Sequence, residues 1–207
     1  MSLRAGAAHR RVTKGTLITM ETNEPFSIET ARLTLRDYQE EDYQAVHAFR
    51  SDPLVARYWT GKPDTPEETR AFLLRVREGA LQRPRTQYRL AVVLRETGAV
   101  IGGCALYGMT DPVAREGGIG FYLSRPCWGS GYATEAATAL VAFGFETLNL
   151  HRIYGDCAPE NAASARVMRK IGMRQEGHQR ENFWSGDGWQ DSLLFAVLDH
   201  EWESRRA

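Results

Sequence analysis

Residues 128–134 read Trp-Gly-Ser-Gly-Tyr-Ala-Thr and carry the most specific chemistry in the sequence. Glycine has no side chain to cover neighbouring backbone groups, so Gly129 and Gly131 leave several N–H groups accessible. An apolar stripe at helical spacing begins directly afterwards with Ala133 and Ala137. The N-terminus of a helix favours anions through its free N–H groups and its dipole. This segment, called the glycine loop below, therefore predicts a phosphate site.

Two common phosphate-binding patterns do not fit the glycine loop. The loop of kinases and ATPases ends in Gly-Lys followed by Ser or Thr, and no lysine follows Gly131. The dinucleotide-binding pattern needs a third glycine, which this sequence lacks at the required place. An ordinary strand–turn–helix corner without a ligand is the simplest alternative.

The glycine loop resembles the signature of the GNAT acetyltransferases, [Gln or Arg]-x-x-Gly-x-[Gly or Ala]. Gly131 and Ala133 fill its last two fixed places, whereas Trp128 departs from the first. The run Trp-Gly-x-Gly-Tyr-Ala-Thr-Glu-Ala recurs in the branch that acetylates protein N-termini. A second set of residues resembles the ribosomal-protein N-terminal acetyltransferases of that branch: His151-Arg152-Ile153-Tyr154, Asn161-x-x-Ser164, Lys170-Ile171-Gly172-Met173 and Glu176-Gly177.

The resemblance implies that acetyl-coenzyme A (acetyl-CoA) is the co-substrate. The strand ending at residue 123 would pair with the pantetheine arm, and the N–H groups of the glycine loop would hold the pyrophosphate. The expected cofactor-binding residues are Phe121, Tyr122, Leu123, Trp128, Gly129, Ser130, Gly131, Tyr132, Ala133, Thr134, Asn161 and Ser164.

The catalytic residues follow less directly. In this branch of the family the serine of Asn-x-x-Ser protonates the departing thiolate, which implies this role for Ser164; a first-turn serine that bonds only to nearby backbone is the alternative. Glu116 and Glu181 are candidate bases, with water as the alternative. Asp156 and Asp191 are further possibilities for the base, although the resemblance implies a structural anchor for Asp191. An acetyl-cysteine intermediate at either Cys127 or Cys157 is not expected, because neither has a histidine in a recognisable triad.

The expected acceptor is a primary amine, with a protein N-terminal α-amino group favoured. A small-molecule amine such as an antibiotic, polyamine or amino acid is the alternative, and a CoA-binding regulatory module without turnover is a third. Four aromatic-loop residues would bind the acceptor: Tyr58, Trp59, Phe183 and Trp184.

The surrounding elements predict an α/β fold with a mixed sheet and helices on both faces. The periodicity gives the order β-α-α-β-β-β-α-β-α-β-β, which is also the order of the GNAT fold. The sharpest local signal is at Thr65, an N-cap with Pro66 at the first helical position and Glu68 closing a capping box. Residues 1–27 are expected to be a flexible leader and residues 28–207 a single acetyltransferase domain.

Composition limits the other functions of this chain. It has 207 residues with 26 basic and 26 acidic side chains, which implies no general attraction to nucleic acid. No apolar run approaches the roughly 18 residues needed to span a membrane. Three cysteines without metal-ligand spacing predict no metal site and fit the cytoplasm. Many relatives form homodimers through their C-terminal strands, which leaves a homodimer as an option here.

Overall fold

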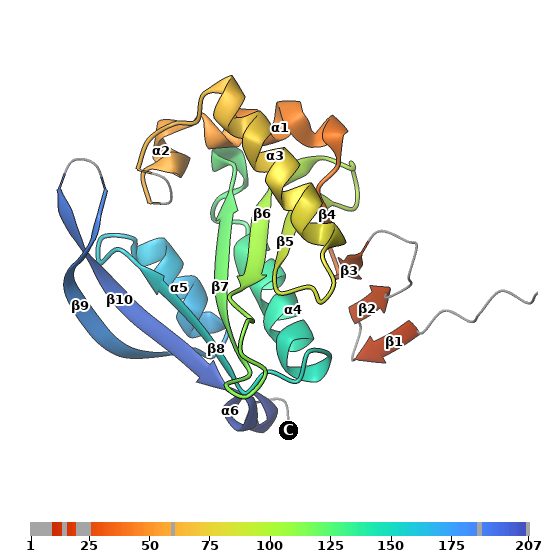
Figure 1. Cartoon of the computed structure of the whole chain (residues 1–207), viewed down its shortest axis with the longest axis vertical. Coiled ribbons are helices and arrows are strands. Elements are labelled where there is room, and N and C mark those ends of the chain that lie inside the picture. Colours follow the sequence, from red (N-terminus) through yellow and green to blue (C-terminus); the bar gives the residue numbers. More distant parts are fainter. Residues whose placement is uncertain (1–9, 14–15, 20–25, 59–60, 186–187, 206–207) are drawn as a thin grey trace, which may run out of the picture.

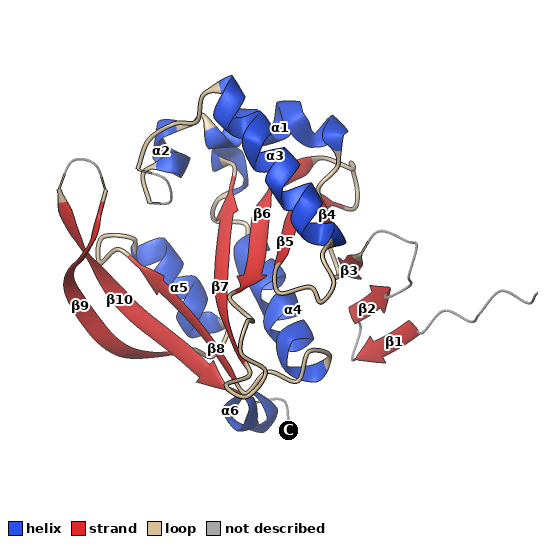
Figure 2. Ribbon diagram, viewed as in Figure 1, coloured by secondary structure: helices blue, strands red, loops and turns tan. Residues whose placement is uncertain are grey.

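The computed structural model describes residues 10–13, 16–19, 26–58, 61–185 and 188–205. In this part of the chain a mixed sheet of ten strands carries helices on both faces (Figures 1 and 2). The strands are β1 Arg10–Thr13, β2 Thr16–Thr19, β3 Ser27–Glu29, β4 Leu33–Asp37, β5 Tyr88–Leu94, β6 Val100–Tyr107, β7 Glu116–Leu123, β8 Arg152–Cys157, β9 Arg174–Trp184 and β10 Trp189–Leu198. The helices are η1 Glu40–Asp42, α1 Tyr43–Arg50, α2 Pro53–Ala56, α3 Pro66–Leu81, η2 Arg125–Cys127, α4 Tyr132–Glu146, α5 Ala162–Lys170 and α6 Asp199–Ser204.

The sheet opens between β7 and β8. These two strands are parallel neighbours and pair only from Glu116 opposite Arg152 to Gly118 opposite Tyr154. Beyond Gly118, β7 stays paired with β6 as far as Leu123, whereas β8 stays paired with β10. The C-terminal halves of β7 and β8 therefore diverge, which leaves unpaired backbone edges on both sides of a gap.

Each face of the sheet has its own hydrophobic core. On one face α4 and α5 pack against side chains from the central strands, including the fully buried Leu106, Leu140 and Ile153. On the other face α1 and α3 cover a smaller core that includes Val46 and Phe72. These helices lie over β4 to β6 and leave the front of β8 to β10 uncovered (Figure 1). One half of that face therefore remains open to ligands.

The elements from β4 onward match the predicted order, except for the short helices α2 and α6, which that order lacks. The capping box at the start of α3 is confirmed, with the Glu68 N–H bonded to Thr65 Oγ1 (3.2 Å) and the Thr65 N–H bonded to the Glu68 carboxylate (2.8 Å). None of the described helices is long and apolar enough to cross a bilayer.

Residues 10–13 and 16–19, within the segment 1–27 that we expected to be a flexible leader, form strands. These strands are β1 and β2, and β2 pairs with β3, which begins at Ser27. The sequences Arg-Val-Thr and Thr-Leu-Ile-Thr are rich in β-branched residues, which fit the edge of a sheet. Their short length and the basic composition of the start concealed this preference.

Candidate active site

A cavity of about 940 Å³ lies at the gap between β7 and β8. Its walls come from the ends of these strands, the glycine loop, α5, the α2 segment and the tip of the β9–β10 hairpin. The structure brings together most of the predicted binding residues here: Tyr58, Phe121, Tyr122, Leu123, Trp128, Gly129, Gly131, Tyr132, Ala133, Thr134, Asn161, Ser164, Phe183 and Trp184. Residues far apart in the sequence thus line one continuous space.

The glycine loop has the backbone geometry that an anion site requires. Gly129 and Gly131 have φ angles of 77° and 82°, a region that other residues rarely adopt. Gly131 is the N-cap of α4, and the first N–H to close a helical hydrogen bond is that of Glu135, to the Gly131 carbonyl (3.0 Å). The N–H groups of residues 132–134 precede this bond and face out of the helix end.

Trp128 acts differently from the prediction. Its backbone N–H, which we expected at the pyrophosphate, donates instead to the Arg125 carbonyl (3.0 Å) within the short turn η2. Its indole Nε1–H donates to the Leu123 carbonyl (2.8 Å). The tryptophan therefore connects the glycine loop to the end of β7, which gives a structural role to the residue that departs from the signature. Ser130 also lies outside the cavity lining, and its carbonyl accepts a hydrogen bond from Arg32 Nη1 (3.0 Å).

A carboxylate behind the loop fixes its position. Glu135, in the first turn of α4, accepts hydrogen bonds from Thr30 Oγ1 (2.7 Å), the Arg32 N–H (2.8 Å) and Arg32 Nε (2.7 Å). Burial favours the neutral acid, but these hydrogen bonds outweigh burial and lower the pKa of Glu135. Sequence reasoning missed this contact because the partners are more than 100 residues apart in the chain.

Ser164 and Asn161 lie side by side at the start of α5. Asn161 is the N-cap, and its side-chain Oδ1 accepts the N–H of Ser164 (3.1 Å), as its type and position predicted. Among the described residues no protein group bonds the Ser164 hydroxyl, which therefore has its donor available to a ligand in the cavity.

The two predicted bases do not reach the cavity. Glu116 begins β7 at the end where β7 and β8 are still paired, opposite Arg152. Glu181 has an exposed side chain and a φ of 49°, and its N–H donates to Asp191 Oδ1 (2.8 Å). Asp191 also pairs with His178 (2.6 Å) and so anchors the hairpin. Among the described lining residues, the carboxylates are Asp156 and Glu160.

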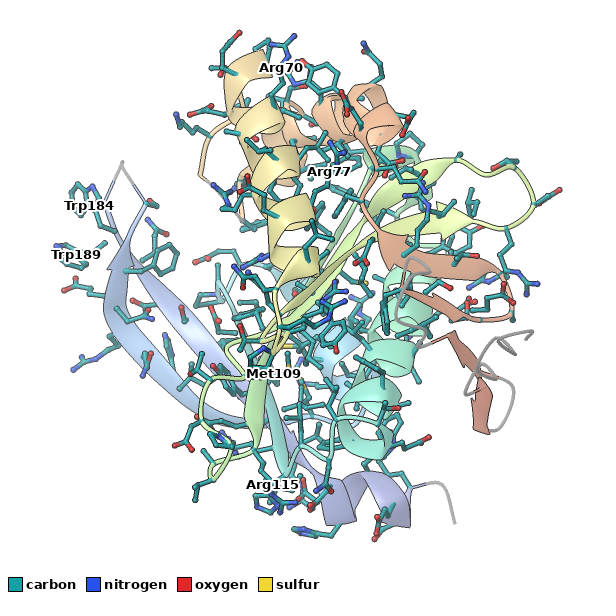
Figure 3. The ribbon with its side chains drawn as sticks, turned by 45° about the vertical axis from the view of Figure 1, so that its right-hand side comes forward. Arg70, Arg77, Met109, Arg115, Trp184 and Trp189 are labelled. Carbon is teal, nitrogen blue, oxygen red and sulfur yellow. The ribbon has the colours of Figure 1, made fainter. Side chains whose placement is uncertain are left out.

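The wall opposite the glycine loop is aromatic. Tyr58, Phe183 and Trp184, called the aromatic rim below, line this side, and Trp184 packs edge-on against Trp189 at the hairpin tip with ring centroids 5.6 Å apart (Figure 3). The predicted residue Trp59 lies outside the described residues.

The chain after α2 approaches the tip of the β9–β10 hairpin beside this rim. A side chain at Gly61 would begin 2.9 Å from the Ser185 carbonyl, so only glycine allows this approach.

Comparison with known proteins shows whether the chain is an acetyltransferase or one of the alternatives considered from its sequence. A sequence model described as the acetyltransferase (GNAT) domain matches residues 32–174. The chain belongs to the GNAT acetyltransferase family. It is 35% identical over 175 residues to the uncharacterized N-acetyltransferase YnaD of Bacillus subtilis, covering 84% of this chain and 98% of that protein. Spermidine N(1)-acetyltransferase of Escherichia coli K12 is 25% identical over 168 residues, covering 81% and 87%.

A solved structure agrees with this assignment. The GNAT-family acetyltransferase from Bacillus anthracis superposes with a TM-score of 0.75 at 32% identity, covering 84% of this chain and 99% of that chain. The protein is therefore an acetyl-CoA-dependent N-acetyltransferase, and the alternative of a CoA-binding module without turnover is set aside.

Acetyl-CoA fits the residues of this GNAT site. The outward-facing N–H groups of residues 132–134 suit its pyrophosphate, and the unpaired edge of β7 suits its amide-bearing arm. Two cations on α5, Arg166 and Lys170, line the same side of the cavity and add positive charge for the phosphates. When bound, acetyl-CoA supplies an activated acetyl group as a thioester.

Cys157, which lines the cavity, is a poor nucleophile. Burial raises the pKa of Cys157 to about 11, so its thiol stays protonated at neutral pH. This agrees with the expectation that no acetyl-cysteine forms on it.

Proposed function

We propose that this enzyme acetylates a primary amine by direct attack on acetyl-CoA, and that the acceptor is a protein N-terminal α-amino group. The observation that carries the proposal is the single cavity, which reaches from the glycine loop past Ser164 to the aromatic rim. Both substrates can occupy it together, so the acetyl group needs no intermediate carrier on the protein.

The α-amino group is favoured by its acidity. A free α-amino group has a pKa near 8, so about 1.4 kcal/mol deprotonates it at pH 7, whereas a lysine side chain requires roughly 4.6 kcal/mol. A modest base is therefore enough for an N-terminus. The motifs from His151 to Gly177 support the same acceptor, because they resemble the ribosomal-protein N-terminal acetyltransferases.

Residues of this chain act at three points of the reaction. The glycine loop and the edge of β7 orient the thioester, and a backbone N–H near Leu123 stabilises the oxyanion that forms when the amine attacks. Ser164 then donates a proton to the departing thiolate from the start of α5. The aromatic rim holds the acceptor on the opposite side.

A small amine is the second candidate acceptor. It is favoured by the 25% identity to spermidine N(1)-acetyltransferase and by the two carboxylates, Asp156 and Glu160, that line the cavity. A polyamine carries several positive charges, and carboxylates would complement them.

Thiol release from acetyl-CoA separates these candidates. The protein is mixed with peptides that differ in their first residue and, separately, with spermidine, free amino acids and aminoglycosides. Release that depends on peptides with a free N-terminus, and disappears when that N-terminus is blocked, supports the proposal. Release with the small amines alone would transfer the assignment to the second candidate.

A further inference from the structure

Asp156 occupies a special place in the opened sheet. It lies on β8 two residues beyond Tyr154, the last residue of β8 that pairs with β7. Its side chain is open to the cavity that also holds Ser164 and the aromatic rim. The divergence of the strands therefore brings this carboxylate to the edge of the gap where the thioester arm is expected.

The face of the sheet that carries Asp156 is the face left uncovered by α1 and α3. Ile153 on β8 is fully buried on the opposite face, against α4 and α5, so alternation places Tyr154 and Asp156 on the open face. An acceptor that approaches from this face meets Asp156, whereas acetyl-CoA enters from the side of the glycine loop and α5. The carboxylate thus faces the acceptor rather than the cofactor phosphates.

Two glycines of β7, Gly118 and Gly120, lie on the same face, under the ring of Tyr107. A side chain at Gly118 would begin 2.5 Å from the ring of Tyr107, and one at Gly120 would begin 3.7 Å from it. The ring of Tyr107 therefore occupies the space above Gly118 and extends along β7 toward Gly120. This contact explains Gly118, which no turn requires, whereas a Cβ at Gly120 would meet the ring only at ordinary contact distance.

The carboxylate of Asp156 has no cationic partner within 4.0 Å in the described part of the chain, and no hydrogen bond to it is found there. Burial and the nearby charge of Asp156 both raise the pKa of the Tyr107 hydroxyl, on β6, and of the Cys157 thiol, on the same strand as Asp156. Neither carries a positive charge. Although the side chain opens to the cavity, the surrounding protein still removes water from it, and this burial raises the pKa of Asp156.

We propose that Asp156 binds the ammonium group of the acceptor and serves as the general base of the transfer. An unpaired carboxylate on the acceptor side of the cavity complements a cation, and no other group in the described lining fits this role as well. Glu160 begins the turn before α5, on the side of Asn161 and the cofactor. This proposal rests on the proposed function, acetylation of an amine.

Transfer of the acetyl group to the amine involves two proton losses from nitrogen. Asp156 takes one proton from the bound ammonium, which gives a neutral amine. The nitrogen lone pair forms a C–N bond with the acetyl carbonyl, and collapse of the oxyanion breaks the C–S bond. Ser164 protonates the departing thiolate and is itself reprotonated by the second proton that the nitrogen loses. The first proton, held by Asp156, passes to water. The products are the acetylated amine, coenzyme A and one proton.

The test is Asp156→Asn, an isosteric change without the charge. With an acceptor that is an ammonium ion at pH 7, kcat/KM for the acceptor is expected to fall by about 100-fold or more, the usual contribution of a general base. The dissociation constant of acetyl-CoA should stay within about twofold of the wild type, which also reports that the variant is folded. The fall of kcat/KM on the acid side of the pH profile should move from the pKa of Asp156 to the pKa of the acceptor amine, because only the neutral amine can react without the base.

Two comparisons make this result specific. An aromatic amine is largely uncharged at pH 7 and needs no ammonium site, so Asp156→Asn should affect its acetylation far less. Glu96→Gln removes a carboxylate from the exposed turn between β5 and β6 and should change neither substrate's kinetics. Asp156→Glu keeps the charge and should recover part of the activity.

Failure of the role proposed for Asp156 can be distinguished from failure of the proposed function. If the wild type releases thiol with an amine and Asp156→Asn does so with equal kcat/KM and an unchanged pH profile, Asp156 has no such role, while the proposed function stands. If the wild type binds acetyl-CoA but no amine accelerates thiol release, the proposed function falls and the role of Asp156 falls with it.

Discussion

At the scale of single residues, Gly131 has a backbone conformation that the proposed acetyl-CoA site requires. Its φ of 82° costs a residue with a Cβ about 1–3 kcal/mol, and a side chain there would also begin 3.5 Å from Arg32 Nη2. Gly131→Val should therefore raise the dissociation constant of acetyl-CoA by about tenfold or more, measured by titration calorimetry. Gly98→Val is the matched control, because Gly98 has a φ of 71° with open space around it, in the β5–β6 turn.

The Gly98→Val control separates the effect of backbone strain on stability from an effect on acetyl-CoA binding. Both valine variants should lose stability to a similar extent, but only the change at Gly131 should weaken acetyl-CoA binding. An unchanged dissociation constant for Gly131→Val would show that the glycine loop does not hold the pyrophosphate.

Ser164 carries the prediction about the leaving group. Its hydroxyl has no protein partner among the described residues, so Ser164→Ala removes a proton donor without leaving a buried group unpaired. We expect kcat to fall by roughly 100-fold with the dissociation constant of acetyl-CoA within about threefold of the wild type. Ser204→Ala, which removes a hydroxyl bonded to the His200 carbonyl in α6, should leave both values unchanged. Equal kcat for Ser164→Ala and the wild type would remove the serine from the mechanism.

Residue types alone predicted some of these positions and missed others. Asn161 was predictable because an asparagine before an amphipathic run is a strong N-cap signal, and the structure has that cap. Glu116 and Glu181 were chosen from their places along the chain, but the gap between β7 and β8 gives the cavity Asp156 instead. Where two strands stop pairing depends on contacts across the whole sheet, so local sequence does not reveal it.

At the scale of elements, Glu135 connects α4 to the turn between β3 and β4. Its carboxylate accepts three hydrogen bonds from Thr30 and Arg32, and the indole of Trp128 connects the same loop to β7. The loop is therefore held from both sides before any ligand binds. Pre-organisation of this kind reduces the entropy lost on binding.

The pKa of Glu135 predicts a pH dependence of stability. Because this pKa is lowered in the folded protein, the folded state binds the proton less readily than the unfolded chain. The stabilisation is complete well above the unfolded pKa of about 4.3 and is lost as the pH falls through the folded pKa. Glu135→Gln should lower the free energy of unfolding at pH 7 by roughly 1–3 kcal/mol. The difference from the wild type should shrink in acid, as followed by urea denaturation at several pH values.

The opposite result is a free energy of unfolding that falls equally in Glu135→Gln and the wild type as the pH is lowered. If the difference between Glu135→Gln and the wild type is the same at pH 7 and pH 4, the carboxylate charge does not stabilise the fold.

Sequence patterns predicted the elements themselves well. The start of α3 and the hairpin of β5 and β6 follow from capping residues and alternation, which act within a few residues. The strands β1 and β2 were missed because their preference is weak and depends on pairing with the edge at β3.

At the scale of the whole molecule, the sheet separates two tasks. The face covered by α4 and α5 forms the larger core and presents the glycine loop, whereas the open half of the other face presents Asp156 and the aromatic rim. The gap between β7 and β8 connects the two faces. Cofactor and acceptor can therefore approach from different sides and meet at the thioester.

This arrangement predicts direct transfer of the acetyl group, which initial rates can test. Thiol release is measured over a matrix of acetyl-CoA and acceptor concentrations. Direct attack within one cavity predicts double-reciprocal lines that intersect, because both substrates are bound before any product leaves. Parallel lines, with an acetyl group left on the protein after incubation with acetyl-CoA alone, would mean a covalent intermediate and would contradict the account.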